Sequence, residues 1–352
     1  MMKILIVKLG AMGDVLRTTP LLTRLKKEHP GSRITWVVDA RCREALEENP
    51  LIDRLLNYSP ETLAVLEQET FDLAVNLDKD AEALDAIGAA RAAKKMGFGR
   101  SAKGALCALD RLSDYAYRLG VDDELKFRKN KKSYQEISFE QLGLRFQKED
   151  YLFSVDGPSE AAARRHLETL GFPWEDQERP VVGLNTGSGA RFAGKKLPIE
   201  TYLDLIAKFH DRMGAKVLLL GGKDEVERNR EIERRSSFPV VNTGSHPIRT
   251  FAAIVRRCDL VVSGDTTAMH IAIAVKTPVV AYFASTCSAE IELYGRGKKV
   301  ISEISCAPCY LRNCPIDEQC MKDMRAETLF RAAQEALKES VIASPEGAKQ
   351  SS

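Results

Sequence analysis

Three short segments combine glycine with residues that could perform chemistry, and the first of them is Lys8–Val15. Gly10 and Gly13 let the backbone turn sharply and approach a ligand closely. Asp14 opens the helical pattern that follows, where it could cap the helix or serve as a general base. The two roles can coexist, although a helix N-terminus favours the carboxylate and so weakens it as a base. The segment is neither the G-x-G-x-x-G dinucleotide fingerprint nor a P-loop.

The second segment, Asn185–Gly189, places Thr186 and Ser188 beside glycines, and Lys195 follows a few residues later. Hydroxyl groups and free backbone N–H groups can donate to phosphate oxygens. A lysine adds a point charge for the same phosphates. Taken alone, such a loop is often only a turn, so a phosphate-binding role for this segment depends on its occurring together with the other two.

The third segment, Ser263–His270, again reads as a strand end, a glycine turn and a helix start. Thr266 and Thr267 would present hydroxyls and N–H groups at a helix N-terminus, which is a ready anion site. Asp265 could be only an N-cap, and His270 only a helix histidine with its bonds satisfied. Three such segments at corresponding strand ends are hard to explain as coincidence.

Short apolar runs alternate with longer helical patterns along the chain, and these elements must position the three segments. In the first half we expect strands over 3–9, 33–38 and 71–77, with helices over 15–28, 40–48 and 81–93. In the second half we expect strands over 180–185, 215–220, 240–242, 260–263 and 278–283, with helices over 159–170, 199–213, 225–235 and 247–257. Alternation of this kind predicts a parallel sheet with right-handed crossovers, built twice. Ligands of open α/β sheets bind at the carboxyl ends of the strands, where all three segments fall.

We therefore predict an α/β protein with two Rossmann-like, doubly wound domains, 1–157 and 158–324, that face each other across a cleft. A chain of 352 residues is long for one core and comfortable for two. Pro, Gly and charged residues cluster at 155–158 and at 173–179, so the boundary is expected in one of these stretches. A last helix over 325–341 could pack back on the first domain, and the polar tail 344–352 is expected to be disordered.

The bulk composition excludes several classes of protein. A net charge of only +2 argues against a dedicated nucleic-acid binder. The apolar run near the N-terminus is too short for a signal peptide, and no apolar stretch is long enough to span a bilayer. We expect a cytoplasmic protein that is not transmembrane and keeps its thiols reduced.

Basic residues cluster in two groups in the first half of the chain. Each group could be an ordinary solvated surface or a face that binds an anionic partner. The two groups are Arg91, Lys94, Lys95, Arg100 and Lys103, and then Lys126, Arg128, Lys129, Lys131 and Lys132.

The three segments together resemble glycosyltransferase family 9, the lipopolysaccharide heptosyltransferases. Gly10–Asp14, followed by Thr18–Pro20, looks like the opening motif of the family. Gly264–His270 resembles its second signature, Asp-Thr-Gly-x-x-His, and Lys195–Pro198 resembles its donor-loop Lys-x-Trp-Pro. The matches are spread over the chain in the right order.

Two departures from the family pattern lie on the donor side. Thr267 stands where the family usually has glycine, and Leu197 replaces the tryptophan. Because both lie on the donor side, they bear on the identity of the sugar nucleotide more than on the type of reaction.

The resemblance implies a GT-B fold and inverting transfer of heptose from ADP-heptose to an anionic lipopolysaccharide-core acceptor of the lipid A–Kdo type. It places the enzyme in the cytoplasm or on the cytoplasmic face of the inner membrane. It makes Asp14 the base, Lys195 a catalytic cation and Gly10 and Gly13 part of an acceptor-facing loop. The residues it assigns to the donor are Thr186, Ser188, Asp265, Thr266, Thr267 and His270. No cofactor or metal is expected in the transfer step, and the basic residues of the first half suit the anionic acceptor.

Four cysteines share one short stretch near the C-terminal end: Cys306, Cys309, Cys314 and Cys320. Four soft ligands at such spacing could hold zinc or an iron–sulfur cluster. The spacing is not that of a standard ribbon, and the proline-rich loop could simply hold thiols or paired disulfides. Similar cysteine-rich segments in some heptosyltransferase relatives imply a structural role.

Other functions remain as alternatives at this point. The protein could be a GT-B enzyme that uses a UDP- or GDP-sugar for transfer or epimerisation. It could also be a non-catalytic nucleotide- or metal-binding protein, although such a protein has no need of Asp14 together with Lys195 and His270. A dehydrogenase is disfavoured because the dinucleotide fingerprint is absent.

Overall fold

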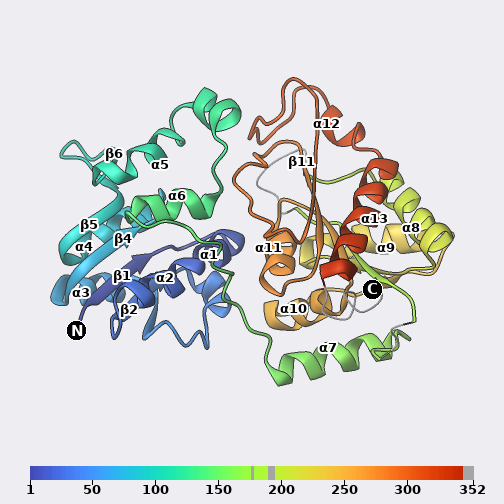
Figure 1. The fold of residues 1–352 in the computed structure, drawn as a ribbon, viewed down its shortest axis with the longest axis horizontal. Coiled ribbons are helices and arrows are strands. Elements are labelled where there is room, and N and C mark those ends of the chain that lie inside the picture. Colours follow the sequence, from blue (N-terminus) through green and yellow to red (C-terminus); the bar gives the residue numbers. More distant parts are fainter. Residues whose placement is uncertain (176–177, 189–194, 344–352) are drawn as a thin grey trace. The chain divides into compact units, whose positions relative to one another are not determined.

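The structure is a computed structural model that describes residues 1–175, 178–188 and 195–343. The predicted disordered tail, 344–352, therefore lies outside the described residues. The chain divides into two compact units. Unit 1 is Met1–Ser154 with Ala289–Glu292, and unit 2 is the remainder from Val155. Each unit contains one six-stranded sheet (Figure 1).

The sheet of unit 1 has the strand order β3-β2-β1-β4-β5-β6. Its strands are β1 (Lys3–Val7), β2 (Arg33–Val38), β3 (Arg54–Asn57), β4 (Thr70–Asn76), β5 (Arg91–Arg100) and β6 (Leu106–Ala108). All neighbours pair in parallel except β5 and β6. The central strand β1 is buried from Ile4 to Val7, as a continuous apolar run between two helical layers requires.

The helices of unit 1 begin where local chemistry allows. They are α1 (Met12–Thr18), α2 (Pro20–Glu28), α3 (Pro60–Gln68), α4 (Ala81–Ala89), α5 (Asp114–Arg118) and α6 (Tyr134–Gln141), with short turns η1 (Ala40–Ala45), η2 (Arg111–Ser113) and η3 (Leu125–Lys129). The single helix predicted over 15–28 is wrong, because Pro20 has no N–H to continue α1 and starts α2 instead. The segment predicted as a helix over 40–48 forms only the 3-10 turn η1.

The sequence prediction missed three strands of this sheet: β3, β5 and β6. The helix predicted over 81–93 ends at Ala89, and Arg91 already belongs to β5. The first half of β5 carries Lys94 and Lys95 and is mostly exposed, whereas Met96–Gly99 is buried. A strand whose burial changes along its length has no clear period of two, so its alanines read as a helix.

The sheet of unit 2 is parallel throughout, in the order β12-β11-β10-β7-β8-β9. Its strands are β7 (Val181–Asn185), β8 (Lys216–Leu220), β9 (Val241–Asn242), β10 (Leu260–Gly264), β11 (Val279–Phe283) and β12 (Gly297–Ile301), the last of which was not predicted. Its helices are α7 (Gly157–Thr169), α8 (Ile199–Met213), α9 (Val226–Arg235) after the turn η4 (Lys223–Glu225), α10 (Ile248–Arg257), α11 (Thr267–Ala274), α12 (Gln319–Lys322) and α13 (Ala326–Ala343). The predicted strand–helix alternation of this half is confirmed.

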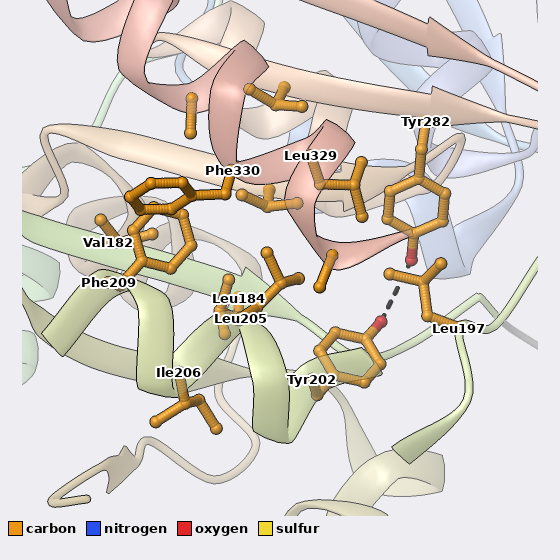
Figure 2. Close-up of a cluster of buried hydrophobic side chains, with 14 of the residues drawn as sticks. Val182, Leu184, Leu197, Tyr202, Leu205, Ile206, Phe209, Tyr282, Leu329 and Phe330 are labelled. Carbon is orange, nitrogen blue, oxygen red and sulfur yellow. Dashed lines mark hydrogen bonds between the residues drawn. The ribbon is translucent and has the colours of Figure 1, made fainter. Parts of the chain in front are cut away.

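Helices α8 and α13 bring their apolar faces together over the sheet of unit 2 (Figure 2). Phe209 of α8 and Phe330 of α13 meet edge to face with ring centroids 5.3 Å apart. The expectation that the last helix packs back on the first domain is therefore wrong. Leu329 and Phe330 are fully buried beside Val182 in unit 2, because this face of the sheet offers the apolar surface that the helix must cover.

Candidate active site

In unit 1, the loop after β1 is anchored by a carboxylate from the neighbouring strand. Asp78 follows β4, and its Oδ2 accepts the N–H groups of Leu9 (3.0 Å) and Gly10 (3.3 Å). Its Oδ1 lies 3.1 Å from Nζ of Lys8, and both side chains are almost fully buried. Burial alone would lower the pKa of Lys8, but Tyr134, Asp14 and Asp78 together raise it above its ordinary value. The loop that leads to Asp14 is thus held by a buried ion pair.

Asp14 lies one turn inside α1, since the helix begins at Met12 with Ala11 as its N-cap residue. The view of Asp14 as the N-cap itself is therefore wrong. Its Oδ2 reaches back to accept the N–H of Ala11 at 3.2 Å, which is the carboxylate half of a capping box. Gly13 is buried in the first turn of α1 rather than in the preceding loop. The carboxylate of Asp14 remains one-third exposed.

Asp14 also forms an ion pair with the residue three positions later in the same helix. Nη2 of Arg17 lies 2.7 Å from its Oδ1, and the guanidinium stacks 4.0 Å from the ring centroid of Tyr134. Burial alone would lower the pKa of Arg17, but the carboxylates of Asp14 and Glu290 raise it above its ordinary value. The hydroxyl of Tyr134 lies 2.9 Å from that of Thr18. Asp14 thus sits in a packed polar cluster that fixes its orientation.

In unit 2, the loops after β7 and β10 meet because these strands are neighbours in the sheet. Asn185, the last residue of β7, joins them: its Nδ2 donates to the carbonyl of Gly187 at 3.0 Å and to the hydroxyls of Ser263 and Thr266 at 3.2 Å each. Asn185 and Ser263 are buried, so this network holds the loops after β7 and β10 in place from the interior of unit 2. The second and third segments of the sequence analysis thus lie side by side.

Lys195, Asp265 and His270 form a second polar cluster at these loops. Nζ of Lys195 donates to the carbonyl of Asp265 at 2.9 Å and lies 3.5 Å from its Oδ2. Nε2 of the buried His270 lies 3.9 Å from Oδ1 of the same carboxylate. Helix α11 begins at Thr267, whose side chain is exposed, with Thr266 as the N-cap residue. The first-turn N–H groups of a helix have no partner within it, so an anion can bind there beside Lys195.

Thr186 does not face outward as the sequence analysis expected of a donor-binding residue. It is fully buried, and its hydroxyl donates to Oδ1 of Asn229 at 2.5 Å and lies 3.3 Å from the carbonyl of Leu220. The reason is that the N–H of Thr186 donates to the carbonyl of Leu220 at 3.2 Å, so residue 186 continues the pairing of β7 with β8. Ser188, two residues later, is partly exposed.

Glu225 lies at the same loops and was not among the residues that the sequence predicted for the site. Its carboxylate is buried, accepts the N–H of Gly222 at 3.0 Å and lies 3.5 Å from Nζ of Lys196. A Cβ on Gly187 would meet this carboxyl carbon at 2.6 Å, so any larger residue there would have to displace the Glu225 carboxylate. The available signal was the Gly221-Gly222 pair after β8, a third strand-end turn beside β7.

A pair of buried tyrosines supports the same edge of the sheet (Figure 2). The hydroxyl of Tyr202 donates to the carbonyl of Asn185 at 2.9 Å and lies 3.1 Å from the hydroxyl of Tyr282. Burial raises the pKa of Tyr282 to about 12, so both phenols stay neutral. Leu197, which replaces the tryptophan of the family pattern, is buried in the same core. Its side chain therefore packs inward instead of lining a ligand site.

Three of the four clustered cysteines, Cys306, Cys309 and Cys314, lie in the loop after β12, and Cys320 lies in α12. The loop is tied to the segment after β11. The N–H groups of Cys309 and Tyr310 both donate to the carbonyl of Ser285, at 3.2 and 2.9 Å. Cys306 is exposed, while burial, together with the neighbouring thiols, raises the pKa of Cys320 to about 11. Within the part of the chain that the structure describes, no three His, Cys, Asp or Glu side chains are placed to hold a metal ion.

Two doubly wound, mostly parallel units with such loops at the strand ends have the architecture of the GT-B class. A family model described as glycosyltransferase family 9 (heptosyltransferase) matches residues 62–319, a span that includes Lys195 and Ser263–His270 and begins after Asp14. The chain belongs to this family.

Known relatives agree with this assignment. Lipooligosaccharide heptosyltransferase 2 of Campylobacter jejuni subsp. jejuni serotype O:2 is 27% identical over 206 residues, which are 54% of this chain and 63% of that protein. The match thus spans less than two thirds of that relative. The crystal structure of a family 9 glycosyl transferase from Veillonella parvula DSM 2008 has a TM-score of 0.71 at 20% identity, over 96% of this chain and 97% of that one. E. coli ADP-heptose lps heptosyltransferase II has a TM-score of 0.67 at 17% identity, over 96% and 99%. The predicted GT-B fold is confirmed.

No helix in the described ranges is both long and apolar enough to cross a bilayer.

Proposed function

We propose that this protein transfers a heptose from ADP-heptose to a lipopolysaccharide-core acceptor of the lipid A–Kdo type, with inversion at the sugar carbon. The observation that carries the proposal is the grouping of Lys195, Asp265, His270 and the start of α11 at one sheet edge of a family 9 protein. This grouping has the chemistry to hold a nucleoside diphosphate. The similar E. coli structure is described as an ADP-heptose enzyme, which supports ADP-heptose as the donor.

On the donor side, the chain's own charges would stabilise the leaving group. As the bond between the sugar carbon and the diphosphate oxygen breaks, negative charge grows on the departing ADP. The ammonium of Lys195 and the N–H groups at the start of α11 would meet that charge. Asp265 holds Lys195 in place through two contacts, so the ammonium is oriented before the donor arrives. These groups supply the positive potential, and the proposal requires no metal ion or other cofactor.

Glu225 would bind the nucleoside part of the donor. An ionised carboxylate only accepts hydrogen bonds, and the two hydroxyls of a ribose can donate to it. It lies between the Gly187 loop and Gly222, beside the loops that would hold the diphosphate. Ser188, Thr266 and Thr267 would complete the donor site, while Thr186 would support it from the core.

On the acceptor side, Asp14 would take the proton of the attacking hydroxyl. The acceptor oxygen then forms a bond to the anomeric carbon of the heptose on the face opposite the departing ADP, which leaves with the electron pair of the broken bond. Attack from the opposite face inverts the configuration. Gly10 keeps the loop before α1 thin, which suits close approach of the acceptor. Because Arg17 pairs with Asp14 at 2.7 Å, the acceptor must compete with this ion pair for the carboxylate.

We also propose that the enzyme works in the cytoplasm, at the inner face of the inner membrane, on an anionic glycolipid acceptor. The exposed basic residues of unit 1, such as Lys103, Arg128 and Lys131, suit an acceptor that carries phosphate and carboxylate groups.

A donor panel tests the proposal. Purified protein is incubated with a Kdo-containing lipid A acceptor and ADP-heptose, UDP-glucose or GDP-mannose, with and without a metal chelator, and the product is identified by mass spectrometry. We expect heptose transfer from the ADP-sugar alone, unaffected by the chelator. Transfer only from a UDP- or GDP-sugar would refute the donor assignment. Thr267, which departs from the family pattern at the exposed start of α11, makes this second donor class the specific alternative.

A further inference from the structure

Arg17 is a nearly buried cation whose charge is balanced by a group that the reaction would neutralise. Its side chain is 14% exposed, and its Nη2 lies 2.7 Å from Oδ1 of Asp14. When Asp14 takes the proton of the acceptor hydroxyl, this carboxylate becomes a neutral acid. A buried charge that loses its counter-ion is strongly destabilised. The proton transfer therefore needs a second anion that can balance Arg17.

The guanidinium of Arg17 has a donor left over for such an anion. Within the part of the chain that the structure describes, its Nε is buried and has no hydrogen-bond partner. An arginine carries five N–H donors in one planar fork, so it can bind two carboxylates. The ring of Tyr134, whose centroid lies 4.0 Å from the guanidinium carbon, supports that plane from one side.

Glu290 lies in a segment that the fold brings to this arginine. Residues Ala289–Glu292 belong to unit 1, although they lie between β11 and β12 in the sequence and the residues on either side of them belong to unit 2. The carbonyl of Glu290 accepts the N–H of Tyr134, the first residue of α6, at 2.9 Å. The first N–H groups of a helix have no partner within it, so this bond holds the segment beside the tyrosine on which Arg17 stacks.

The carboxylate of Glu290 acts on Arg17 and is not engaged by another cation. Against the effect of burial, it helps Asp14 to raise the pKa of Arg17 above its ordinary value. Among the described residues, no Lys, Arg or His nitrogen lies within 4.0 Å of this carboxylate. Lys79, another charged neighbour, donates instead to the carbonyl of Ala116 at 3.2 Å. Glu290 can therefore bind Arg17 without first breaking an ion pair.

We propose that Glu290 is a positioning residue for the transfer reaction and that it acts through Arg17. In the resting enzyme, Arg17 pairs with Asp14. When the acceptor hydroxyl gives its proton to a carboxylate oxygen of Asp14, Arg17 stays protonated and shifts to Glu290, so that its charge remains balanced. No other proton moves. The proposal rests on the proposed function, because it requires Asp14 to be the base.

Single-turnover transfer at saturating donor and acceptor tests this role. Glu290→Gln keeps the size of the side chain and removes its charge, so it should slow transfer about 10- to 100-fold. Glu290→Asp keeps the charge and should retain most of the rate. ADP affinity should be unchanged in both variants, because Glu290 belongs to unit 1 and the proposed donor residues belong to unit 2. A wild-type rate in Glu290→Gln would overturn the proposal.

A second substitution separates this role from a merely structural one. In Arg17→Met no guanidinium remains to be balanced, so adding Glu290→Gln should cause no further loss of rate. The double variant should therefore transfer heptose faster than Glu290→Gln alone. Losses that simply add would show that Glu290 does not act through Arg17.

A matched control removes one carboxylate from the other end of the same helix. Glu140 is exposed near the end of α6 and pairs with Lys132 at 2.6 Å. Glu140→Gln should keep the wild-type rate, since its charge is already balanced far from Arg17. An equal loss in this control would mean that the effect of Glu290→Gln is not specific to its position, and the proposal would be wrong.

The titration of Asp14 gives a readout that needs no heptose transfer. Its side-chain carboxyl resonance is followed by NMR in protein labelled with ¹³C-aspartate and is assigned from its absence in Asp14→Asn. In Glu290→Gln, protonation of Asp14 leaves Arg17 without a counter-ion, so it should require a pH lower by about 0.5 unit or more. The Arg17→Met/Glu290→Gln variant should reverse this change.

The other groups that face Asp14 do not blur this measurement. Burial raises the pKa values of Tyr134, Tyr151 and Cys42, so these three side chains stay neutral as the pH falls. Lys8 stays charged beside Asp78, because its pKa is also raised.

The two readouts separate this proposal from the proposed function. If Asp14 titrates at lower pH in Glu290→Gln but the wild type transfers no heptose, the function is wrong and the link between Glu290, Arg17 and Asp14 stands. If the wild type transfers heptose but Asp14 titrates alike in both proteins, the function stands and the role of Glu290 is wrong.

Discussion

Removing the carboxylate of Asp78 should destabilise unit 1 severely. In the Asp78→Ala variant, the ammonium of Lys8 stays buried without its counter-ion, and the N–H groups of Leu9 and Gly10 lose their acceptor. Breaking a buried ion pair costs about 3–5 kcal/mol, and each unsatisfied buried donor adds about 1–3 kcal/mol. Because these contributions overlap, we expect a loss of about 4–6 kcal/mol in the free energy of unfolding. The side chains are only 5% and 11% exposed, so solvent screens the pair little.

Two further variants separate the contributions. Asp78→Asn keeps an oxygen for the two N–H groups but loses the charge, so it should cost less than Asp78→Ala. Adding Lys8→Met to Asp78→Asn removes both charges and should recover most of the loss. The resulting coupling energy between the two positions should reach about 1–3 kcal/mol.

Tryptophan fluorescence gives a local readout. The chain has two tryptophans, and Trp36 donates from Nε1 to the carbonyl of Lys8 at 3.1 Å inside unit 1. In a Trp174→Phe background, urea unfolding followed by fluorescence therefore reports on the loop that Asp78 anchors. Trp174 belongs to unit 2, so circular dichroism of the same samples follows the rest of the protein.

The pH dependence provides a second check. The folded pKa of Lys8 is raised above its ordinary value of 10.5, so the stability it contributes is complete below that value and is lost only as pH rises through the folded pKa. The stability that Lys8 contributes in the wild type should thus be constant between about pH 6 and pH 9. A loss below about 1 kcal/mol, or no coupling with Lys8, would refute the ion-pair reasoning.

Three other substitutions test the proposed chemistry. Asp14→Asn should keep the fold and donor binding but lower single-turnover transfer by about 10²–10⁴-fold, and near-wild-type rates at saturating substrates would remove Asp14 as the base. Lys195→Ala should weaken ADP binding, measured by calorimetry, by about 1.5–3 kcal/mol, and unchanged affinity would exclude Lys195 from the site. Replacing Cys306 and Cys309 with Ser should lower the melting temperature while the folded enzyme keeps its turnover. A stoichiometric metal whose removal abolishes activity without unfolding would contradict this structural role.

Much of the fold could be predicted from local sequence patterns. Buried parallel strands such as β1, β7 and β10 are continuous apolar runs, and the helices between them carry their own start signals, so their type and order were predictable. The strands that were missed differ in kind. β3 and β12 lie at sheet edges and are only partly buried, and β5 changes burial along its length, so none has the pattern of a central strand.

The candidate site divides in the same way. Segments with Gly10, Lys195 and Thr266 could be located because strand ends in a parallel sheet share one edge, and that rule needs only the order of elements. The partners of those residues could not be located. Asp78 lies 69 residues from Leu9, and Asp265 lies 70 residues from Lys195, and nothing in the local sequence of either member of a pair specifies the other.

The sequence by itself therefore determined which elements form and which of their ends carry reactive groups. Only the tertiary structure decided that Thr186 is buried in the core, that Asp78 pairs with Lys8 and that Glu225 fills the space a Cβ on Gly187 would need. The physical reason is that local propensity and apolar periodicity act over a few residues. Burial and the pairing of charges are instead settled between segments that meet only when the sheet is assembled.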